Sequence, residues 1–164
     1  MIMANIYVAS SWRNDYQPKV VSVLRSAGHA VYDFKNPSPG DNGFHWSEID
    51  PNWKGWSPDE FREGLDHPLA KKGYGKDRNA MVWANAGLLV LPSGLSAHLE
   101  AGWLSGRGKP TAVFAPEIKE PELMYKLMEE SFIGDSSIGK WFCTTIDEVM
   151  EYFHSVDKFL GIVR

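Results

Sequence analysis

Two carboxylates, Glu100 and Asp77, stand where the surrounding sequence would let them do chemistry. Glu100 follows a wholly apolar run, Leu88 to Leu91, and a turn of small residues, after which a helical period begins near Ser96. This order predicts a buried parallel strand and places Glu100 in the first turn of the next helix, beyond the carboxyl end of that strand. Ligands bind at that position in open α/β sheets, and the helix dipole would keep the carboxylate ionised and nucleophilic.

Asp77 lies at the start of a helix predicted over residues 76–85, which leads into the same apolar strand. If both helices meet one strand edge, the two carboxylates face one cleft. Paired carboxylates suit glycosidic chemistry, in which one attacks or stabilises the anomeric carbon and the other handles protons. Each residue also has a plainer interpretation, since a first-turn glutamate stabilises a helix and an N-terminal aspartate caps one. Gly102 and Gly106 favour a functional role for Glu100, because glycine there indicates close approach of another group.

A polar turn follows the first predicted strand and contains Ser10, Ser11, Trp12 and Arg13. A turn and helix start at this place can hold an anion, and Arg13 offers a bidentate fork for phosphate. A solvated surface arginine is the alternative. The turn has too few glycines for a Walker loop or a dinucleotide fingerprint, which argues against ATPase and NAD-dependent activities.

A long irregular segment, residues 35–56, separates the second predicted strand from the next helix and carries Phe44, His45 and Trp46. A loop of this length in a compact domain is usually a lid or a binding loop, or a sign that an element has been missed. The histidines have no paired metal spacing and Cys143 is the single cysteine, so we predict no metal site and no cofactor.

These residues must be positioned by alternating strands and helices. Strands are predicted at residues 6–8, 29–34, 88–91, 111–114 and 141–143. Helices are predicted at residues 16–27, 76–85 and 120–130. Three more are predicted to begin at Ser57, with a break near His67, at Ser96 and at Thr145. Ser57 with Glu60, and Thr145 with Glu148, have the spacing of capping boxes. The alternation predicts a five-stranded parallel sheet with helices on both faces.

The chain of 164 residues suits a single domain over residues 1–164. A net charge of −4 gives no general attraction to nucleic acid or anionic lipid, so neither is an expected partner. One cysteine fits a reducing compartment, and no secretory signal or membrane span is recognised. The sequence therefore predicts a cytoplasmic protein.

Three stretches in this order resemble the nucleoside 2-deoxyribosyltransferase family, which includes nucleoside 5′-monophosphate N-glycosidases. The similarity extends over most of residues 5–115. It is carried by Ile6-Tyr7-Val8-Ala9-Ser10-Ser11-Trp12-Arg13, by Asp77 ahead of the central strand, and by His98-Leu99-Glu100-Ala101-Gly102-Trp103 followed by Gly108-Lys109-Pro110.

The resemblance implies a flavodoxin-like three-layer sandwich with Glu100 as the nucleophile. It also implies proton handling or substrate positioning by Asp77, and an aromatic hydroxyl, that of Tyr7, close to the glutamate. Residues 10–13 would contact the sugar or phosphate. The family usually forms homo-oligomers, dimers or larger, in which neighbouring subunits complete the site.

The sequence departs from the family pattern before the glutamate. The common Ser-Gly-Thr is replaced by Gly94-Leu95-Ser96-Ala97, so the hydroxyl expected near position 97 is missing, and Ser93 and Ser96 both stay candidates to replace it. Asn85 stands where the family has an aspartate.

We therefore expect an enzyme that cleaves the N-glycosidic bond of a nucleoside or nucleoside 5′-monophosphate. Water as acceptor gives a hydrolase and a second base gives a transferase, and both stay open. Arg13 beside two serines favours a phosphorylated substrate, and Phe44, His45 and Trp46 are candidates to stack on the base or close over it. The alternative is a non-catalytic nucleotide-binding or sensor domain on the same fold.

Overall fold

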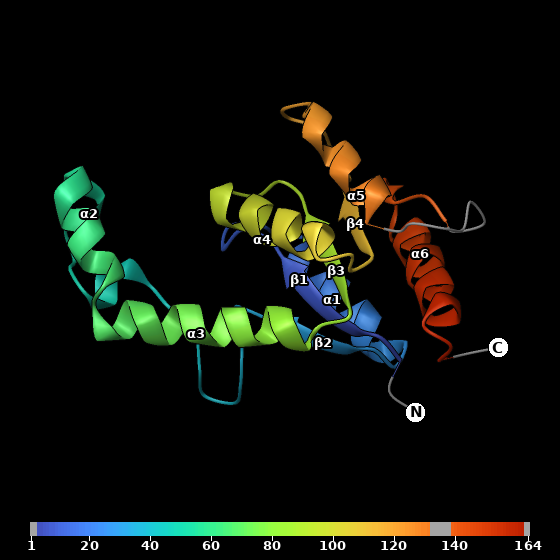
Figure 1. Cartoon of the computed structure of the whole chain (residues 1–164), viewed down its shortest axis with the longest axis horizontal. Helices are drawn as coiled ribbons and strands as arrows, with labels where there is room; N and C mark the ends of the chain where they lie inside the picture. Colours follow the sequence, from blue (N-terminus) through green and yellow to red (C-terminus); the bar gives the residue numbers. More distant parts are fainter. Residues whose placement is uncertain (1–2, 132–138, 163–164) are drawn as a thin grey trace. The chain divides into compact units, whose positions relative to one another are not determined.

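The computed structural model describes residues 3–131 and 139–162 and contains a parallel sheet of five strands in the order β2-β1-β3-β4-β5 (Figure 1). This is the flavodoxin-like order, and it confirms the predicted fold class. The strands are β1 (Asn5–Ala9), β2 (Ala30–Asp33), β3 (Ala86–Val90), β4 (Thr111–Phe114) and β5 (Phe142–Cys143). All four neighbouring pairs are parallel.

The α-helices include long ones between the strands and a short one before β5. They are α1 (Gln17–Ser26), α2 (Pro58–Leu65), α3 (Pro68–Trp83), α4 (Leu95–Gly106), α5 (Leu127–Glu130) and α6 (Ile146–Phe159), with 3-10 turns η1 (Trp46–Glu48), η2 (Trp53–Gly55) and η3 (Leu123–Lys126). Among the described residues, no helix has the length and apolar character needed to cross a membrane.

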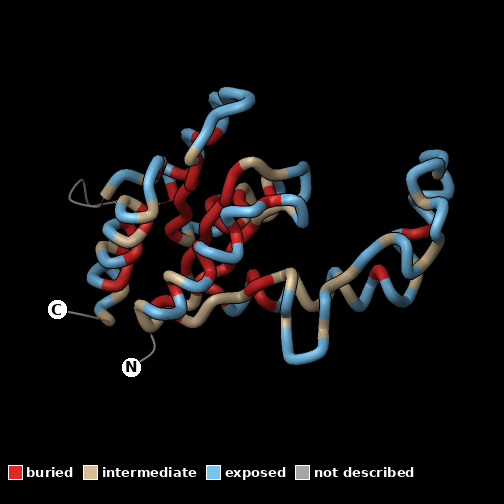
Figure 2. Tube along the Cα trace, turned by 180° about the vertical axis from the view of Figure 1, so that it is seen from behind, coloured by how far each residue is buried: buried red, intermediate tan, exposed pale blue. Residues whose placement is uncertain are grey.

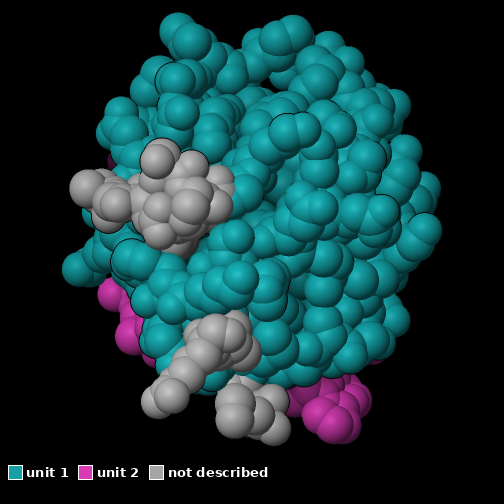
Figure 3. Space-filling view, turned by 90° about the vertical axis from the view of Figure 1, so that its right-hand side faces the viewer, with its two compact units in different colours: residues 1–33, 83–164 teal, residues 34–82 magenta. Residues whose placement is uncertain are grey.

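The chain divides into two compact units (Figure 3). The sheet unit comprises residues 1–33 and 83–164, and the helical unit comprises residues 34–82. Buried residues gather along the strands and the helix faces that cover them, as Figure 2 shows. The helices of the helical unit bury only Gly64, Ala70, Ala80 and Met81.

One face of the sheet is covered by α1 and α6. Alternate strand residues, such as Ile6 and Val8 of β1 and Leu88 of β3, form one buried cluster with apolar residues of these two helices. Successive strand side chains point to opposite faces, so the residues between them face the other way. Cys143 belongs to this cluster as a small core residue, and the buried apolar residues along one side of α6 belong to it too.

The opposite face is covered by α4, with α5 against β4. A Cβ added to Gly87 of β3 would lie 2.8 Å from Leu104 Cδ1, so glycine is what lets α4 approach the sheet this closely. Tyr7 of β1 is in register with Gly87, and it therefore points to the face that α4 covers. Together the two covered faces make the three layers of the predicted sandwich.

Two predicted helices differ from the observed ones. The helix predicted over residues 76–85 begins earlier, at Pro68, and runs through Gly73 and Gly75. Glycine disfavours a helix interior by local propensity, but Gly73 is needed where Phe44 packs, since an added Cβ would lie 2.7 Å from Phe44 Cβ. The helix predicted around 120–130 is split into η3 and the short α5.

The segment predicted as irregular contains η1 and η2 and folds around aromatic rings. Trp46 makes edge contacts with Phe44, Trp56 and Phe61 at centroid distances of 4.9, 5.6 and 5.5 Å. Trp56 donates from Nε1 to Asp50 at 2.6 Å. This aromatic cluster joins the segment to α2, whose predicted capping box between Ser57 and Glu60 is present.

Candidate functional site

The site suggested by the topology lies where β1 and β3 end side by side. The helix that follows β1 covers one face of the sheet and the helix that follows β3 covers the other. The connections from these two neighbouring strands therefore leave toward opposite faces. In doubly wound sheets this switch point, beyond the carboxyl ends of the strands, is where ligands bind. Two loops meet there, residues 10–16 after β1 and residues 91–94 after β3.

Side chains of the first loop fasten it to the second. Ser10 Oγ donates to the Val90 carbonyl at 2.8 Å. Asn14, only 2% exposed, donates from Nδ2 to the carbonyls of Val90 at 3.2 Å and Pro92 at 2.9 Å. Its Oδ1 accepts from the amides of Tyr16 at 2.8 Å and Gln17 at 2.9 Å. Sequence reasoning missed Asn14, although asparagine shortly before a helix is a capping signal.

The capping by Asn14 changes how the turn after β1 could hold an anion. The amides of Tyr16 and Gln17 are already bonded, and Pro18 has no N–H, so the start of α1 has little capacity for phosphate. Ser11 Oγ accepts from the Arg13 amide at 3.2 Å, and Trp12 and Arg13 are exposed. Any anion at this turn therefore depends on side chains, chiefly that of Arg13.

Glu100 is in the second turn of α4, because the helix begins at Leu95 and has no acidic residue in its first turn. The prediction of a first-turn position was wrong, since Glu100 is the sixth residue of the helix and one turn takes about 3.6 residues. The helix dipole acts mainly within the first turn, so it contributes less to Glu100 than expected. The residue is half-buried, which gives its carboxylate partial shielding from water.

The orientation of Glu100 follows from the buried stripe of α4. Ala97, Ala101 and Leu104 are buried toward the sheet, and at about 100° per residue Glu100 lies on one flank of that stripe. Ser105 lies on the opposite flank, where its Oγ donates to the Leu127 carbonyl at the start of α5. Since α5 packs on β4, the flank with Glu100 is the one on the side of β1.

Tyr7 lies on that same side. It is fully buried on the face covered by α4, and its ring stacks on Tyr32 of β2 with centroids 5.3 Å apart. Tyr7 and the flank of Glu100 therefore lie on the β1 side of one sheet face, and the Ser10–Arg13 turn lies just beyond the carboxyl end of β1.

The loop before α4 is fixed by His98. Its Nδ1 lies 2.8 Å from the Gly94 carbonyl, and a carbonyl only accepts, so Nδ1 carries a proton; its Nε2 is hydrogen-bonded with the Tyr125 hydroxyl at 3.0 Å. Ser93 Oγ lies 3.4 Å from Nδ1, whereas Ser96 is exposed at the start of the helix. Burial raises the pKa of Tyr125, with Glu122 and Glu120 adding to the effect. Sequence reasoning assigned neither His98 nor Tyr125 a role.

The other predicted site residues belong to the helical unit. Asp77 is the tenth residue of α3 and lies in its interior, and so the prediction that it begins or caps that helix was wrong. Phe44 and Trp46 are half-buried in the aromatic cluster, and His45 is exposed just before η1. The convergence of Asp77 and Glu100 on one cleft stays a prediction.

Two parts of the family pattern lie at the opposite, amino edge of the sheet. Asn85 Oδ1 accepts from the Asn5 amide at 2.9 Å, which ties the starts of β1 and β3 together. Gly108 ends α4 with a φ of 69°, and Lys109 Nζ donates to the Ala84 carbonyl. These contacts hold the amino edge of the sheet together, at the end away from the switch point.

The glycines in α4 do not mark a close approach within the chain. A Cβ added at Gly102 or Gly106 meets no described atom within 4 Å, so the group whose approach these two positions predict is not a described part of this chain. The glycines that do admit a neighbour are Gly87 in β3 and Gly64 and Gly73 in the helical unit. Among the described residues, no group of three or more His, Cys, Asp or Glu could hold a metal ion.

A cavity of about 340 Å³ opens at the carboxyl ends of β4 and β5. It is lined by Tyr16, Lys19, Phe114, Pro116, Thr144, Thr145, Ile146 and Asp147. None of the predicted site residues lines it, and it lies on the sheet face covered by α1 and α6, away from the flank of Glu100.

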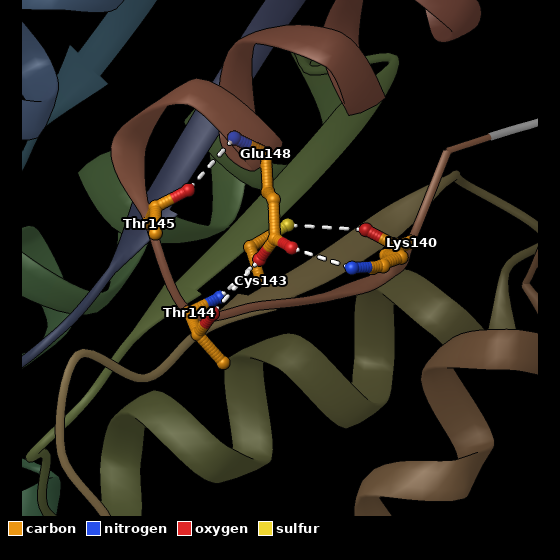
Figure 4. Close-up of polar contacts among 5 residues, drawn as sticks. All are labelled: Lys140, Cys143, Thr144, Thr145 and Glu148. Atoms are coloured by element: carbon orange, nitrogen blue, oxygen red, sulfur yellow. Dashed lines mark hydrogen bonds and ion pairs between the residues drawn. The ribbon is translucent and has the colours of Figure 1, made fainter.

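The turn between β5 and α6 holds a half-buried carboxylate with a lowered pKa, that of Glu148 (Figure 4). Glu148 accepts from Lys140 Nζ at 2.7 Å and from the Thr144 amide and hydroxyl at 2.7 and 3.0 Å, which lowers its pKa to about 2. Thr145 caps α6 by accepting from the Glu148 amide. The predicted box is therefore only half formed, since the carboxylate bonds to Thr144 instead of to the Thr145 amide.

Comparison with known proteins supports the fold. The structure is similar to that of a 2-deoxyribosyltransferase from the psychrotolerant bacterium Bacillus psychrosaccharolyticus, with a TM-score of 0.50 and 22% sequence identity over 88% of each chain. That enzyme is described as a biocatalyst for the synthesis of nucleosides. No protein-family model matches the sequence, and no curated protein matches it.

Proposed function

We propose that this protein cleaves the N-glycosidic bond of a nucleoside or nucleoside 5′-monophosphate, with Glu100 as the nucleophile. The observation that carries the proposal is the placement of Glu100, half-buried on the β1 flank of α4, over the sheet face to which Tyr7 points. The fold likeness to a 2-deoxyribosyltransferase supports the same chemistry.

In the first step, a carboxylate oxygen of Glu100 attacks the anomeric carbon and forms a glycosyl ester. The bond from that carbon to the base breaks, and its electron pair leaves on the base nitrogen, which takes up a proton. Asp77 is the proposed source of that proton, a role that typically contributes about 10²–10⁴-fold to the rate. The Tyr7 hydroxyl would orient the carboxylate by donating a hydrogen bond to it.

In the second step, water or a second base attacks the anomeric carbon and releases the Glu100 carboxylate. Water yields the free sugar or sugar phosphate, and a base yields an exchanged nucleoside. The β1 turn with Ser10, Ser11, Trp12 and Arg13 would hold the sugar and any 5′-phosphate, with Ser93, Gly94 and Ser96 on the facing loop. Phe44, His45 and Trp46 are proposed to act near the base.

The proposal is tested by incubating the native protein with a panel of nucleosides and 5′-monophosphates, with and without a spare base, and separating the products by chromatography. We expect free base or exchanged nucleoside from the native protein. Glu100→Gln, which keeps the shape of the side chain, should lower base release by about 10³-fold or more while ligand-induced thermal stabilisation persists. Full turnover by Glu100→Gln would refute the nucleophile.

Arg13 decides between the two substrate classes. Arg13→Ala should raise the KM for 5′-monophosphates and leave that for free nucleosides unchanged, because only the former present a phosphate to the guanidinium. Binding of nucleotides without any turnover, in the native protein and in Glu100→Gln alike, would favour a sensor domain instead.

A further inference from the structure

We propose that Asn14 is a positioning residue that sets the alignment of the two loops at the switch point, and so of substrate against Glu100. The inference rests on the proposed function. We expect the turn at residues 10–13 to hold the sugar. Asn14, which follows this turn, forms hydrogen bonds with the loop that precedes α4. Nothing in the sequence pattern or in the family resemblance assigned it a role.

The geometry separates two functions within one side chain. The Oδ1 atom accepts two amides of its own segment and so fixes the start of α1. The Nδ2 atom crosses to the other loop and donates to the Val90 and Pro92 carbonyls. Ser10 adds one more bond to the Val90 carbonyl from the same side. The crossing bonds therefore reach both the last residue of β3 and the turn before α4.

Burial makes these bonds hard to replace. Asn14 is 2% exposed, so water has little access to the carbonyls if the amide nitrogen is removed. A buried acceptor left without its donor destabilises the folded state, and the loops can recover that energy only by moving apart to admit water. Such a movement would shift the sugar-holding turn relative to the helix that carries Glu100. A displacement of about 1 Å can lower a rate by about 10²-fold when reacting groups are held in line.

Asn14→Asp tests the crossing bonds alone. An aspartate keeps the acceptor that caps α1 but places an oxygen against the Val90 and Pro92 carbonyls, where the amide nitrogen now donates. We expect kcat for base release to fall by about 10²-fold with KM changed by less than about threefold, because contacts to the substrate remain while its alignment is lost. Ser10→Ala, which removes only the Val90 bond, should lower kcat by a smaller factor in the same direction.

Thr145→Ala is the matched control. It removes a capping bond of α6 in the same unit, which lowers stability, and should leave kcat unchanged. If Asn14→Asp is destabilised as much as Thr145→Ala yet keeps the native kcat, Asn14 is only structural and the proposal is overturned. A rise in KM at constant kcat would also overturn it, since that would make Asn14 a binding residue.

A readout without turnover separates this inference from the proposed function. In ¹⁵N-labelled protein, Asn14→Asp should shift amide resonances of both residues 10–17 and residues 91–96, while Thr145→Ala should shift neither set. Shifts confined to residues 10–17 would show that Asn14 does not couple the loops. A native protein that releases no base but shows both sets of shifts would refute the proposed activity and keep the loop coupling.

Discussion

The sheet unit and the helical unit are packed in different ways. In the sheet unit, every residue of β3 is buried, and aliphatic side chains on alternate strand positions meet those of α1 and α6. In the helical unit, aromatic rings of residues 44–61 pack on one another, and two of them lie against glycines: Trp56 on Gly64 and Phe44 on Gly73. The sheet unit is therefore stabilised by aliphatic side chains at regularly spaced positions, and the helical unit by contacts among a few large aromatic rings.

This difference affects how function is inferred. Aromatic residues in an irregular segment resemble a binding surface, and Phe44 and Trp46 were predicted to contact the base. In the structure these rings already have partners in the aromatic cluster, which accounts for their presence without a ligand. The polar residues Ser10 and Asn14 at the strand ends of the sheet unit are the better evidence for a site, because they fix backbone where the topology places ligands.

The largest expected effect tests the aliphatic core. Leu88→Ala should lower the free energy of unfolding by about 2–5 kcal/mol, because Leu88 is fully buried between α1 and α6 on one sheet face and leaves a cavity. Leu99→Ala is the control: Leu99 on α4 is 75% exposed, and the change should stay within about 0.5 kcal/mol. Denaturant unfolding followed by circular dichroism gives both values, and equal losses would mean that burial does not govern stability here.

The second effect tests the glycine contact of the helical unit. Gly73→Ala should lower stability by about 1–3 kcal/mol, because the new Cβ meets Phe44 at 2.7 Å and overpacks the cluster. Gly75→Ala in the same helix should raise stability by about 0.5–1 kcal/mol, since no described atom lies within 4 Å of its added Cβ and alanine favours helix. Tryptophan fluorescence during denaturation measures the two changes, and the same sign for both would contradict the contact.

The sequence predicted the helices and strands in which apolar residues recur at the spacing of the element. β3, β4 and the α6 stripe were found because a buried strand is continuously apolar and a packed helix repeats its apolar residues. The interior of α3 was missed because Gly73 is used for tertiary contact, which a local propensity does not reveal. At the candidate site, Glu100 was predicted from its position and Tyr7 from the family resemblance, and both roles stay predictions. Asn14 and His98 were missed because their partners are distant in sequence: Asn14 donates to the Pro92 carbonyl, and His98 Nε2 lies 3.0 Å from the Tyr125 hydroxyl.

A third prediction compares glutamates at the same helix position in the two units, Glu148 in α6 and Glu60 in α2. Hydrogen bonds from Lys140 and Thr144 lower the pKa of Glu148 to about 2 from the usual 4.5, so the charged form is favoured in the folded state. Its contribution to stability is present above about pH 4.5 and is lost as pH falls toward about 2. Glu148→Gln should therefore unfold at a lower temperature at pH 7, and the difference from native protein should shrink across that window.

Glu60→Gln is the matched variant in the helical unit. The pKa of Glu60 is also lowered, by its bond from the Ser57 amide, but without a lysine partner, so we expect a smaller loss at pH 7. Thermal unfolding from pH 2 to 7 measures both variants. A difference between native protein and Glu148→Gln that stays constant down to pH 2 would mean that the ion pair with Lys140 does not contribute.

The smallest expected effect tests whether destabilising the helical unit also increases local unfolding of the sheet unit. Burial raises the pKa of the Cys143 thiol to about 12, with Glu148 and Glu151 adding to the effect, so the thiol should react with iodoacetamide at pH 8 only when the sheet unit opens. Leu88→Ala should speed alkylation, because it weakens the cluster that contains Cys143. Gly73→Ala should leave the rate within about a factor of two of native protein, since the contact it disturbs lies wholly in the helical unit. Equal acceleration by both variants would show that the two units open together, and the contrast between their packing would then have no counterpart in how they unfold.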